Sequence, residues 1–249
     1  MSDAQPLKPA NILNIVAINQ GQRALTRGER QPTPLSPSRI QELMADGHVL
    51  VDTRSSAAFG AGHVAASINV QASSSEFEQR VGWVVPDDSP IVLLSETDQE
   101  ATQCVREMAF IGLDSAVAGY LAGGIGAWMG AGLPLTTVDQ MDVSTLQRRL
   151  TAGELAVLDV RTADEWTSGH IRDAGFLPYT SMVPQLDRPA RLGEVPFGTD
   201  QRVAVTCAAG NRSSTAISLM LRHGYRNLVN ITGGMEAWAH AGLPMVNRG

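Results

Sequence analysis

The 249-residue chain has few cysteines, no cluster of basic residues and no long apolar run. Two cysteines give no disulfide framework, which is typical of a protein in a reducing compartment. A net charge of −6 without clustered Lys or Arg argues against nucleic acid as a partner. The apolar stretches are far too short to span a bilayer, and the N-terminal residues lack the apolar core of a signal peptide. We therefore expect a soluble cytoplasmic protein that binds neither nucleic acids nor membranes.

Cys207, one of the two cysteines, follows a predicted strand and precedes a short loop and a helix. The strand is the β-branched run 203–206, and positions 207–214 read Cys-Ala-Ala-Gly-Asn-Arg-Ser-Ser. This loop is too short and too rich in small residues to pack a core, so its backbone N–H groups are free to bind an anion. Apolar periodicity predicts the helix over 213–222, with Gly224 ending it.

A helix N-terminus and a nearby guanidinium both stabilise a thiolate, so this arrangement predicts a nucleophilic Cys207. A buried structural cysteine is the alternative, because free cysteines are among the most buried residues. The glycine and the arginine at fixed distances from Cys207 favour the nucleophile. We predict that substrate binds to the residues that follow it: Ala208, Ala209, Gly210, Asn211, Arg212 and Ser213.

The second half of the chain repeats the first. The segments Val49–Arg54 and Ala156–Arg161 both end in Asp-x-Arg, and their aspartates are 107 positions apart. Gly-His pairs at 62–63 and 169–170 keep this offset, while Gly-Gly, Ala-Trp and Gly-Leu-Pro recur near the end of each half at an offset of 110. Each repeat has the length of a small domain, so we predict a duplicated fold and not a solenoid.

Within each repeat, short apolar runs rich in β-branched residues alternate with helical stretches. Fully apolar strands separated by helices are typical of parallel sheets covered on both faces. The predicted fold class is α/β, with two tandem domains that each have a central, mainly parallel sheet flanked by helices. We assign residues 1–35 to an N-terminal arm and linker, 36–135 to the first domain, 136–141 to a second linker and 142–246 to the second domain.

Several motifs occur in a fixed order along the chain, and all but one of them occur in both repeats. They are an Asp-x-Arg at a strand end, a Gly-His-Val or Gly-His-Ile about ten residues later, a Cys-x-x-Gly-x-Arg loop present only in the second repeat, and a Gly-Gly…Ala-Trp…Gly-Leu-Pro ending. Together they resemble the rhodanese (sulfurtransferase) family. Rhodanese domains are small α/β units with a central parallel sheet, so the resemblance implies the same fold class as the strand pattern.

The first repeat lacks the nucleophile. Its predicted strand ends at Leu94, and the next six residues read Ser-Glu-Thr-Asp-Gln-Glu. Ser95 is therefore the expected counterpart of Cys207, with Thr97 and Glu100 as alternatives because the offset drifts here. The arginine is missing as well, and the acids of this loop would repel an anionic donor. We predict a non-catalytic first domain that packs against a catalytic second one, a division that is common in two-domain rhodaneses.

Features shared by both repeats are predicted to be structural. Asp159, Arg161 and the Gly-His pairs have counterparts in the repeat without the nucleophile, so we expect them to hold the fold. Cys104 lies in the helix after the first loop, with no glycine or arginine at a useful spacing. It is predicted to be structural, and its alternative role as a resolving thiol would require it to lie near Cys207.

The resemblance implies a thiosulfate sulfurtransferase-like enzyme that uses no metal and no organic cofactor. The Cys207 thiolate would attack the outer sulfur of thiosulfate or a persulfide, and the Cys207 persulfide would pass this sulfur to cyanide or a thiol. Loop N–H groups would stabilise the charge of the terminal sulfur, and Arg212 would hold the anionic end of the donor. The expected partners are small-molecule sulfur donors and acceptors, and the stretch 187–199 is a candidate for part of the pocket wall.

Two other functions stay open at this point. Cysteine phosphatases, and enzymes that handle arsenate in the same way, also cradle an oxyanion in a Cys…Arg loop. They place five residues between the two side chains, whereas four residues separate Cys207 from Arg212. The third possibility is a persulfide-carrying or persulfide-sensing interaction module with little turnover of its own.

The N-terminal segment belongs to neither repeat. Residues 8–21 are predicted to form a short helix, followed by a Pro-rich linker over 31–37. The segment is similar to the connector between a metallo-β-lactamase-fold hydrolase and tandem rhodanese domains in fusion proteins. The His-x-His-x-Asp-His motif of that hydrolase is absent, so such a partner would be a separate chain or a part not included in this one. The alternative is a plain arm that packs on the first domain.

Overall fold

The computed structural model describes residues 8–9, 11–24, 30–86, 89–184 and 190–247. It contains two five-stranded sheets with equivalent strand orders, β1-β5-β4-β2-β3 in the N-terminal half and β6-β10-β9-β7-β8 in the C-terminal half. All neighbouring strands in both sheets run parallel. The predicted α/β class with two tandem domains is confirmed.

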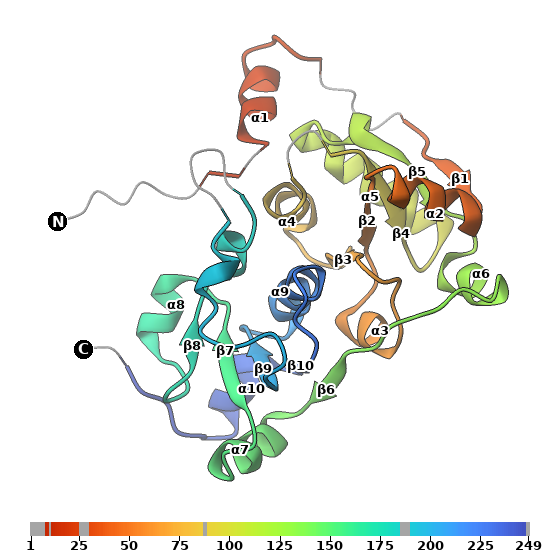
Figure 1. The fold of residues 1–249 in the computed structure, drawn as a ribbon. Coiled ribbons are helices and arrows are strands. Elements are labelled where there is room, and N and C mark those ends of the chain that lie inside the picture. Colours follow the sequence, from red (N-terminus) through yellow and green to blue (C-terminus); the bar gives the residue numbers. More distant parts are fainter. Residues whose placement is uncertain (1–7, 10, 25–29, 87–88, 185–189, 248–249) are drawn as a thin grey trace.

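The first domain follows an N-terminal helix and alternates strands with helices (Figure 1). Its strands are β1 (Thr33–Leu35), β2 (Val49–Asp52), β3 (Ile68–Asn69), β4 (Ile91–Leu94) and β5 (Val117–Leu121). Its α-helices and the helix that precedes it are α1 (Ile12–Asn19), α2 (Pro37–Ala45), α3 (Ser56–Ala61), α4 (Phe77–Val84), α5 (Asp98–Met108) and α6 (Gly124–Gly130). Two short 3-10 helices, η1 (Ala109–Ile111) and η2 (Asp114–Ala116), connect α5 to β5.

The second domain repeats this order. Its strands are β6 (Asp139–Met141), β7 (Ala156–Asp159), β8 (Gly175–Phe176), β9 (Val203–Thr206) and β10 (Leu228–Ile231). Its α-helices are α7 (Val143–Thr151), α8 (Ala163–Ser168), α9 (Asn211–Arg222) and α10 (Gly234–His240). The 3-10 helices η3 (Tyr179–Ser181) and η4 (Leu192–Glu194) lie in the connection between β8 and β9.

The edge strands β1 and β6 lie in segments that the sequence pattern assigned to the arm and to the inter-domain linker. In the structure β1 pairs with β5, with Pro34 opposite Tyr120, and β6 pairs with β10, with Gln140 opposite Asn230. Both strands are three residues long and largely exposed, so they have no apolar pattern of their own. The sheet of each domain therefore begins a few residues before the predicted domain boundary.

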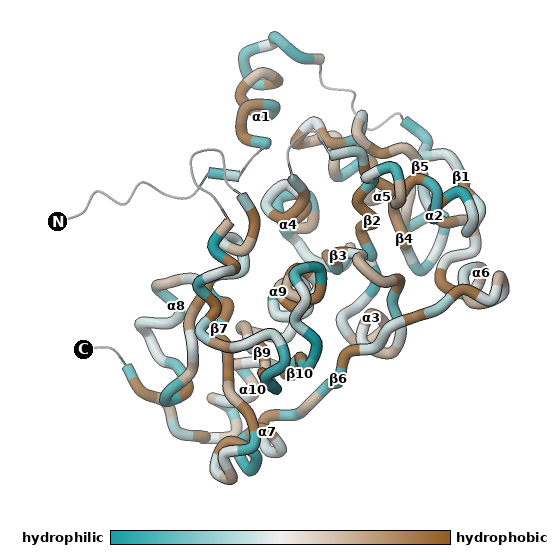
Figure 2. Tube along the Cα trace, in the orientation of Figure 1, coloured by the Kyte–Doolittle hydropathy of each residue, from teal (hydrophilic) through white to brown (hydrophobic). Residues whose placement is uncertain are grey.

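The apolar strands form a core that the two domains share. All four residues of β4 are buried, as are those of β2 and β9, and β2 and β4 are strongly hydrophobic in Figure 2. One cluster of buried side chains runs from Val49 and Ile91 in the first domain to Val203 and Leu219 in the second. A separate cluster covers the outer face of each sheet. The two domains thus share one buried apolar cluster and are not separate units joined only by a linker.

Helix α9 lies between the two domains, beside β3 and α3 (Figure 1). Its hydroxyl side chains meet Asn69 at the end of β3. Ser214 Oγ donates to Asn69 Oδ1 at 2.6 Å, Thr215 Oγ1 donates to the Asn69 carbonyl at 2.7 Å, and the Asn69 N–H donates to Ser218 Oγ at 3.1 Å. These groups are all buried, so each hydrogen bond offsets the cost of taking its donor and acceptor out of water.

The predicted N-terminal helix is present as α1, and the arm packs on the first domain. Arg23 donates to Asn14 Oδ1 of α1 at 2.7 Å and to Ser115 Oγ of the first domain at 2.7 Å. Arg30 adds a hydrogen bond to the Ser115 carbonyl at 3.1 Å. This is the arrangement that the plain-arm alternative describes.

Candidate active site

Cys207 lies directly after β9, the central strand of the second sheet, and only 1 % of its surface is exposed. The carboxyl ends of parallel strands are where open α/β sheets place their ligand sites. The helix that follows is confirmed, but it begins at Asn211, two residues before the predicted start. Gly210 is the reason: it adopts a left-handed conformation with φ of 96° and caps the helix, so the turn into α9 is tighter than the apolar pattern indicated.

The loop directs a backbone donor at the sulfur. The Gly210 N–H donates to Cys207 Sγ at 3.1 Å. A side chain at position 210 is excluded, because its Cβ would lie 3.0 Å from the Ile231 carbonyl oxygen in addition to the left-handed strain. A hydrogen bond of this kind stabilises negative charge on sulfur at the N-terminus of α9.

Helix α10 holds the other side of the loop. The Met235 N–H donates to the Cys207 carbonyl at 2.8 Å, and the Glu236 N–H donates to the Ala208 carbonyl at 2.9 Å. Since a trans peptide places its N–H opposite its carbonyl, the amides of Ala208 and Ala209 point away from α10. The repeated Gly-Gly motif therefore has a local reason in this domain: it brings the start of α10 against the loop.

A chain of polar groups continues from the buried sulfur to Gln140 on the edge strand β6. Cys207 Sγ lies 3.5 Å from Ser213 Oγ, which donates to Asn230 Oδ1 at 2.6 Å. Asn230 Nδ2 in turn donates to Gln140 Oε1 at 2.9 Å and to the Gly210 carbonyl at 3.3 Å. Ser213 was predicted from the sequence, whereas Asn230 was missed. Its signal was a lone amide in the otherwise apolar strand β10.

Arg212 is held by Glu165 at the start of α8. Its Nη1 and Nη2 atoms donate to the two carboxylate oxygens at 2.7 and 2.6 Å. Burial by itself raises the pKa of Glu165, and hydrogen bonds from Arg212 and Thr162 outweigh it, so that the pKa falls to about 2. The same pairing raises the pKa of Arg212 above its ordinary value. Sequence reasoning missed Glu165, although Thr162 and Glu165 form a capping box that marks the first turn of α8.

The Asp-x-Arg motifs make the same contacts in both domains. Arg161 Nη2 lies 2.7 Å from Asp159 Oδ2 and donates to the Gly169 carbonyl at 2.7 Å. In the first domain, Arg54 binds Asp52 at 2.6 Å and the carbonyl of Gly62 at 2.8 Å. These buried ion pairs join a strand end to the Gly-His turn of each domain, which supports the prediction that the motif is structural.

The first domain places Ser95 where the second has Cys207. Leu94 pairs with Asp52 across the sheet as Thr206 pairs with Asp159, so the residues that follow, Ser95 and Cys207, are equivalent. The register thereby decides among the three candidates. The first loop is one residue shorter, because Thr97 caps α5 where Gly210 caps α9.

Glu100 fills the first loop with a carboxylate. Its Oε1 atom accepts hydrogen bonds from the Glu96 N–H at 3.4 Å and from Thr53 Oγ1 at 2.9 Å. The first loop thus binds the carboxylate of Glu100, a residue of the same chain. This supports the prediction that the first domain has no catalytic site of this type.

Comparison with known proteins agrees with these internal repeats. The sequence model of the Rhodanese-like domain matches residues 36–131 and 142–241. The chain belongs to the rhodanese family. The resemblance inferred from the motifs is therefore confirmed for both rhodanese domains.

A sulfurtransferase from Allochromatium vinosum is 36% identical over 110 residues, which are 44% of this chain and 95% of that protein. Protein HIGH ARSENIC CONTENT 1, mitochondrial, from Arabidopsis thaliana is 34% identical over 43% of this chain and 64% of its own length. The solved structure of a rhodanese-related protein from Thermoplasma volcanium has 26% identity and a TM-score of 0.38, and the match covers 44% of this chain and 99% of that one. The named sulfurtransferase supports sulfur transfer as the general chemistry of this rhodanese.

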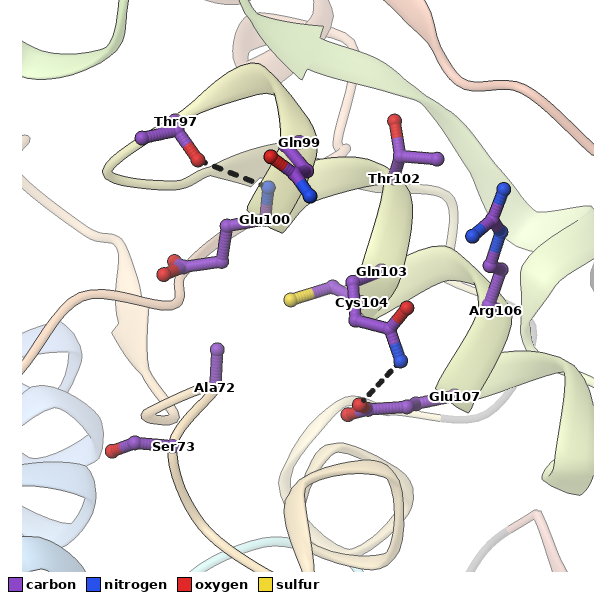
Figure 3. A pocket seen from close by; sticks show the side chains of 10 residues that line it. All are labelled: Ala72, Ser73, Thr97, Gln99, Glu100, Thr102, Gln103, Cys104, Arg106 and Glu107. Carbon is purple, nitrogen blue, oxygen red and sulfur yellow. Dashed lines mark hydrogen bonds between the residues drawn. The ribbon is translucent and has the colours of Figure 1, made fainter.

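Cys104 lies on α5 of the first rhodanese domain and faces a cavity of about 610 Å³ (Figure 3). Its side chain is 1 % exposed. Burial, assisted by the carboxylates of Glu100 and Glu107, raises the pKa of this thiol to about 12. A protonated thiol is a poor nucleophile, so this environment supports a structural role and disfavours a resolving thiol.

The described residues include no group of three or more His, Cys, Asp or Glu side chains that could hold a metal ion. Among these described residues, no helix is long and apolar enough to cross a membrane.

Proposed function

We propose that the protein is a sulfurtransferase that moves sulfane sulfur from thiosulfate or a persulfide to cyanide or a thiol through a persulfide on Cys207. The observation that carries the proposal is the hydrogen bond from the Gly210 N–H to Cys207 Sγ at the N-terminus of α9. Family membership and the named sulfurtransferase relative support it.

The first half-reaction loads the cysteine. With thiosulfate, the Cys207 thiolate attacks the outer sulfur, a new S–S bond forms, and the S–S bond of the donor breaks. Sulfite leaves with the electron pair, and the negative charge of the thiolate passes to the terminal sulfur of the persulfide. The Gly210 N–H already donates to Cys207 Sγ, which supports a role of the loop amides in stabilising that charge.

The second half-reaction removes the transferred sulfur from Cys207. Cyanide or a thiolate attacks the terminal sulfur of the persulfide, and the S–S bond to Cys207 breaks. Cys207 recovers its thiolate, and the product is thiocyanate or a new persulfide. Sulfur and charge balance in each half-reaction without an external oxidant or reductant.

Arg212 has a narrower role in this scheme than the sequence implied. Two of its N–H groups bind Glu165, so they are already committed before a donor arrives. A guanidinium carries five donors, and no further hydrogen bond of Arg212 is found among the described residues, so its remaining N–H groups can bind an anion. Binding of the donor's anionic end by Arg212 stays part of the proposal.

The test is intact-protein mass spectrometry after incubation with thiosulfate or glutathione persulfide. We expect the wild type and Cys104→Ser to gain one sulfur atom that cyanide removes, and Cys207→Ser to gain none. The absence of any adduct on the wild type with either donor would contradict the proposal. An adduct that forms once but supports no repeated turnover with cyanide or a thiol would favour the persulfide-carrying module.

A further inference from the structure

A cavity of about 850 Å³ is lined by residues of both domains, among them Arg212 in the first turn of α9. Its first-domain wall is one face of α4, formed by Glu76, Gln79, Arg80 and Trp83. Its second-domain wall includes Arg161, Phe176, Pro178, Tyr179, Arg191 and Arg212. Part of the stretch 187–199 named from the sequence therefore lines this cavity, through Arg191; residues 187–189 lie outside the described part of the chain.

Helix α4 is built to present its polar face to this cavity. Phe77, Val81 and Val84 lie fully buried in the shared core. Arg80 and Trp83 follow at helical spacing on the face that looks toward the second domain. The first domain thus contributes a cation and an aromatic ring to a space that adjoins the reactive loop of the second.

Arg80 is the least satisfied arginine of the cavity. Its side chain is only 14% exposed, and its ion pair with Glu76 spans 3.5 Å. Its Nε atom is buried without a hydrogen-bond partner among the described residues. By contrast, Arg191 and Arg212 each bind both carboxylate oxygens of a glutamate. A buried guanidinium N–H without an acceptor is costly, so the pairing of Arg80 is weaker than that of Arg191 or Arg212, and the exposed part of its side chain faces the cavity.

Tyr179 lines the same cavity as Arg80 and Arg212. Burial raises the pKa of its hydroxyl, and the guanidinium groups of Arg80 and Arg212 oppose this rise. Arg80 stands on the first-domain wall, whereas Arg212, in the first turn of α9 after the Cys207 loop, stands on the second-domain wall. A ligand that extends from Arg80 toward the Cys207 loop therefore crosses the cavity.

The size and the charge of the cavity define the ligand. Thiosulfate has five non-hydrogen atoms, whereas pockets of several hundred Å³ enclose much larger organic molecules. Four arginines line the cavity, and three of them, Arg161, Arg191 and Arg212, are already paired with an acid. Arg80 is the arginine of this lining with the longest ion pair, at 3.5 Å to Glu76. Trp83 and Phe176 supply apolar contact area. The cavity thus fits an organic anion and exceeds the needs of a small inorganic one.

Building on the proposed sulfur transfer, we propose that the donor is an organic persulfide with a carboxylate remote from its sulfur, and that Arg80 of the first domain binds this carboxylate. Arg80 is then a specificity-determining residue supplied by the domain that lacks the nucleophile. A guanidinium binds a carboxylate through paired hydrogen bonds, which suits a donor that has no acceptor among the described residues.

The test compares Arg80→Gln and Arg80→Lys with the wild type, using glutathione persulfide, its diethyl ester and thiosulfate as donors. Arg106→Gln is the matched control, because it removes an exposed positive charge from the first domain away from this cavity. We expect Arg80→Gln to raise the KM for glutathione persulfide roughly tenfold with kcat unchanged, as expected when a charge-assisted hydrogen bond to substrate is lost. Arg80→Lys should recover part of the loss. The ester and thiosulfate should respond to neither variant.

A binding measurement separates this inference from the proposed function. S-methylglutathione cannot transfer sulfur, so calorimetry reports recognition whether or not the protein turns over. We expect Arg80→Gln to weaken its binding roughly tenfold relative to Arg106→Gln. Equal binding by the two variants, or an equal loss of activity with all three donors, would overturn the role of Arg80. Failure of every donor to load Cys207, with Arg80-dependent binding intact, would instead remove the proposed function alone.

Discussion

At the residue scale, Cys207 and Ser95 occupy the same place in two copies of one fold, so the chain carries its own comparison. Cys207 Sγ accepts a hydrogen bond from the Gly210 N–H at 3.1 Å. Ser95 Oγ instead lies 2.8 Å from Thr53 Oγ1, and the nearby Glu96 N–H is taken by the carboxylate of Glu100. The first loop has therefore lost the nucleophile and also the space for an external anion.

Glu165 gives a prediction with a defined pH dependence. Its pKa falls from 4.5 to about 2 in the folded protein, so the unfolded chain binds the proton first as the pH drops. The stability that this group contributes is complete above about pH 4.5 and is lost as the pH falls toward 2. We expect Glu165→Gln to lower the free energy of unfolding at pH 7 by about 1 kcal/mol, as is typical of a partly exposed ion pair, and urea denaturation measures this loss. The difference in unfolding free energy between the variant and the wild type should shrink at pH 3.

The control for this prediction is Glu42→Gln, because the Arg39–Glu42 pair is far more exposed, with side-chain exposures of 50% and 61%. We expect it to change the urea midpoint little at either pH. A gap between wild type and Glu165→Gln that is the same at pH 7 and pH 3 would show that the Arg212 pair does not lower the pKa of Glu165.

The residue scale also shows how far sequence patterns reach. Cys207 and its loop were predicted because strand, loop and helix signals are contiguous in the chain. Glu165 was not, because its partner Arg212 lies 47 positions away. They meet because β7 and β9 are neighbours in the sheet, which places the start of α8 beside the start of α9. Contacts of this kind follow from strand order, which the local pattern does not contain.

At the scale of elements, the N-terminus of α10 packs against the Cys207 loop and holds it through two backbone hydrogen bonds, an arrangement that we call the α10 clamp. A Cβ at Gly234, where φ is 52°, would lie 2.3 Å from the Cys207 carbonyl and 2.5 Å from that of Ala208. Gly124 at the start of α6 is the counterpart in the first domain, with φ of 58° and 3.0 Å to the Ser95 carbonyl. The two glycines share one backbone geometry, next to a loop that begins with Cys207 in one domain and with Ser95 in the other.

We expect Gly234→Ala to destabilise the fold by more than about 1 kcal/mol, because a side chain is both strained and obstructed there. It should also slow the loading of Cys207 at least tenfold, since the loop has to move. Gly124→Ala should destabilise the protein as well but leave the loading rate unchanged. Thermal unfolding and time-resolved mass spectrometry measure the two effects, and equal slowing by both variants would refute the clamp.

Edge strands mark the limit of prediction at this scale. The apolar central strands β2, β4, β7 and β9 were recognised because burial on both faces leaves a continuous hydrophobic run. β1 and β6 read Thr-Pro-Leu and Asp-Gln-Met, and no local pattern identifies such segments as strands. Only their pairing with β5 and β10 does so. β6 nevertheless matters for the site, because its Gln140 supports Asn230 behind the loop.

At the scale of the whole molecule, α9 is part of the second domain but also packs against the first. Its N-terminus carries the Cys207 loop, while its buried hydroxyl groups bind Asn69 of the first domain. Duplication alone did not predict this arrangement, because each repeat was long enough to bury its own core. The shared cluster of apolar side chains instead joins the two sheets through α9 and the helices around it.

This sharing predicts that the two domains unfold together. Asn69 is a sensitive point, because its Nδ2 atom also donates to the carbonyls of Asp52 and Arg54, at 3.0 and 2.9 Å. Asn69→Ala leaves buried partners unsatisfied in both domains, so we expect a loss of about 2–4 kcal/mol. Asn227→Ala is the control, since it removes an exposed hydrogen bond to the Asp200 carbonyl and should cost less than about 0.5 kcal/mol.

Native-state hydrogen exchange resolves this prediction strand by strand. If one cooperative unit exists, amides of β2 and β4 and those of β7 and β9 exchange with the same free energy of opening, because all of them need the shared core to open. Asn69→Ala should then lower the protection of both sets by the same amount. A loss confined to the first domain would mean that the second folds alone, and the Asn69 contacts with α9 would then be a surface contact between independent domains.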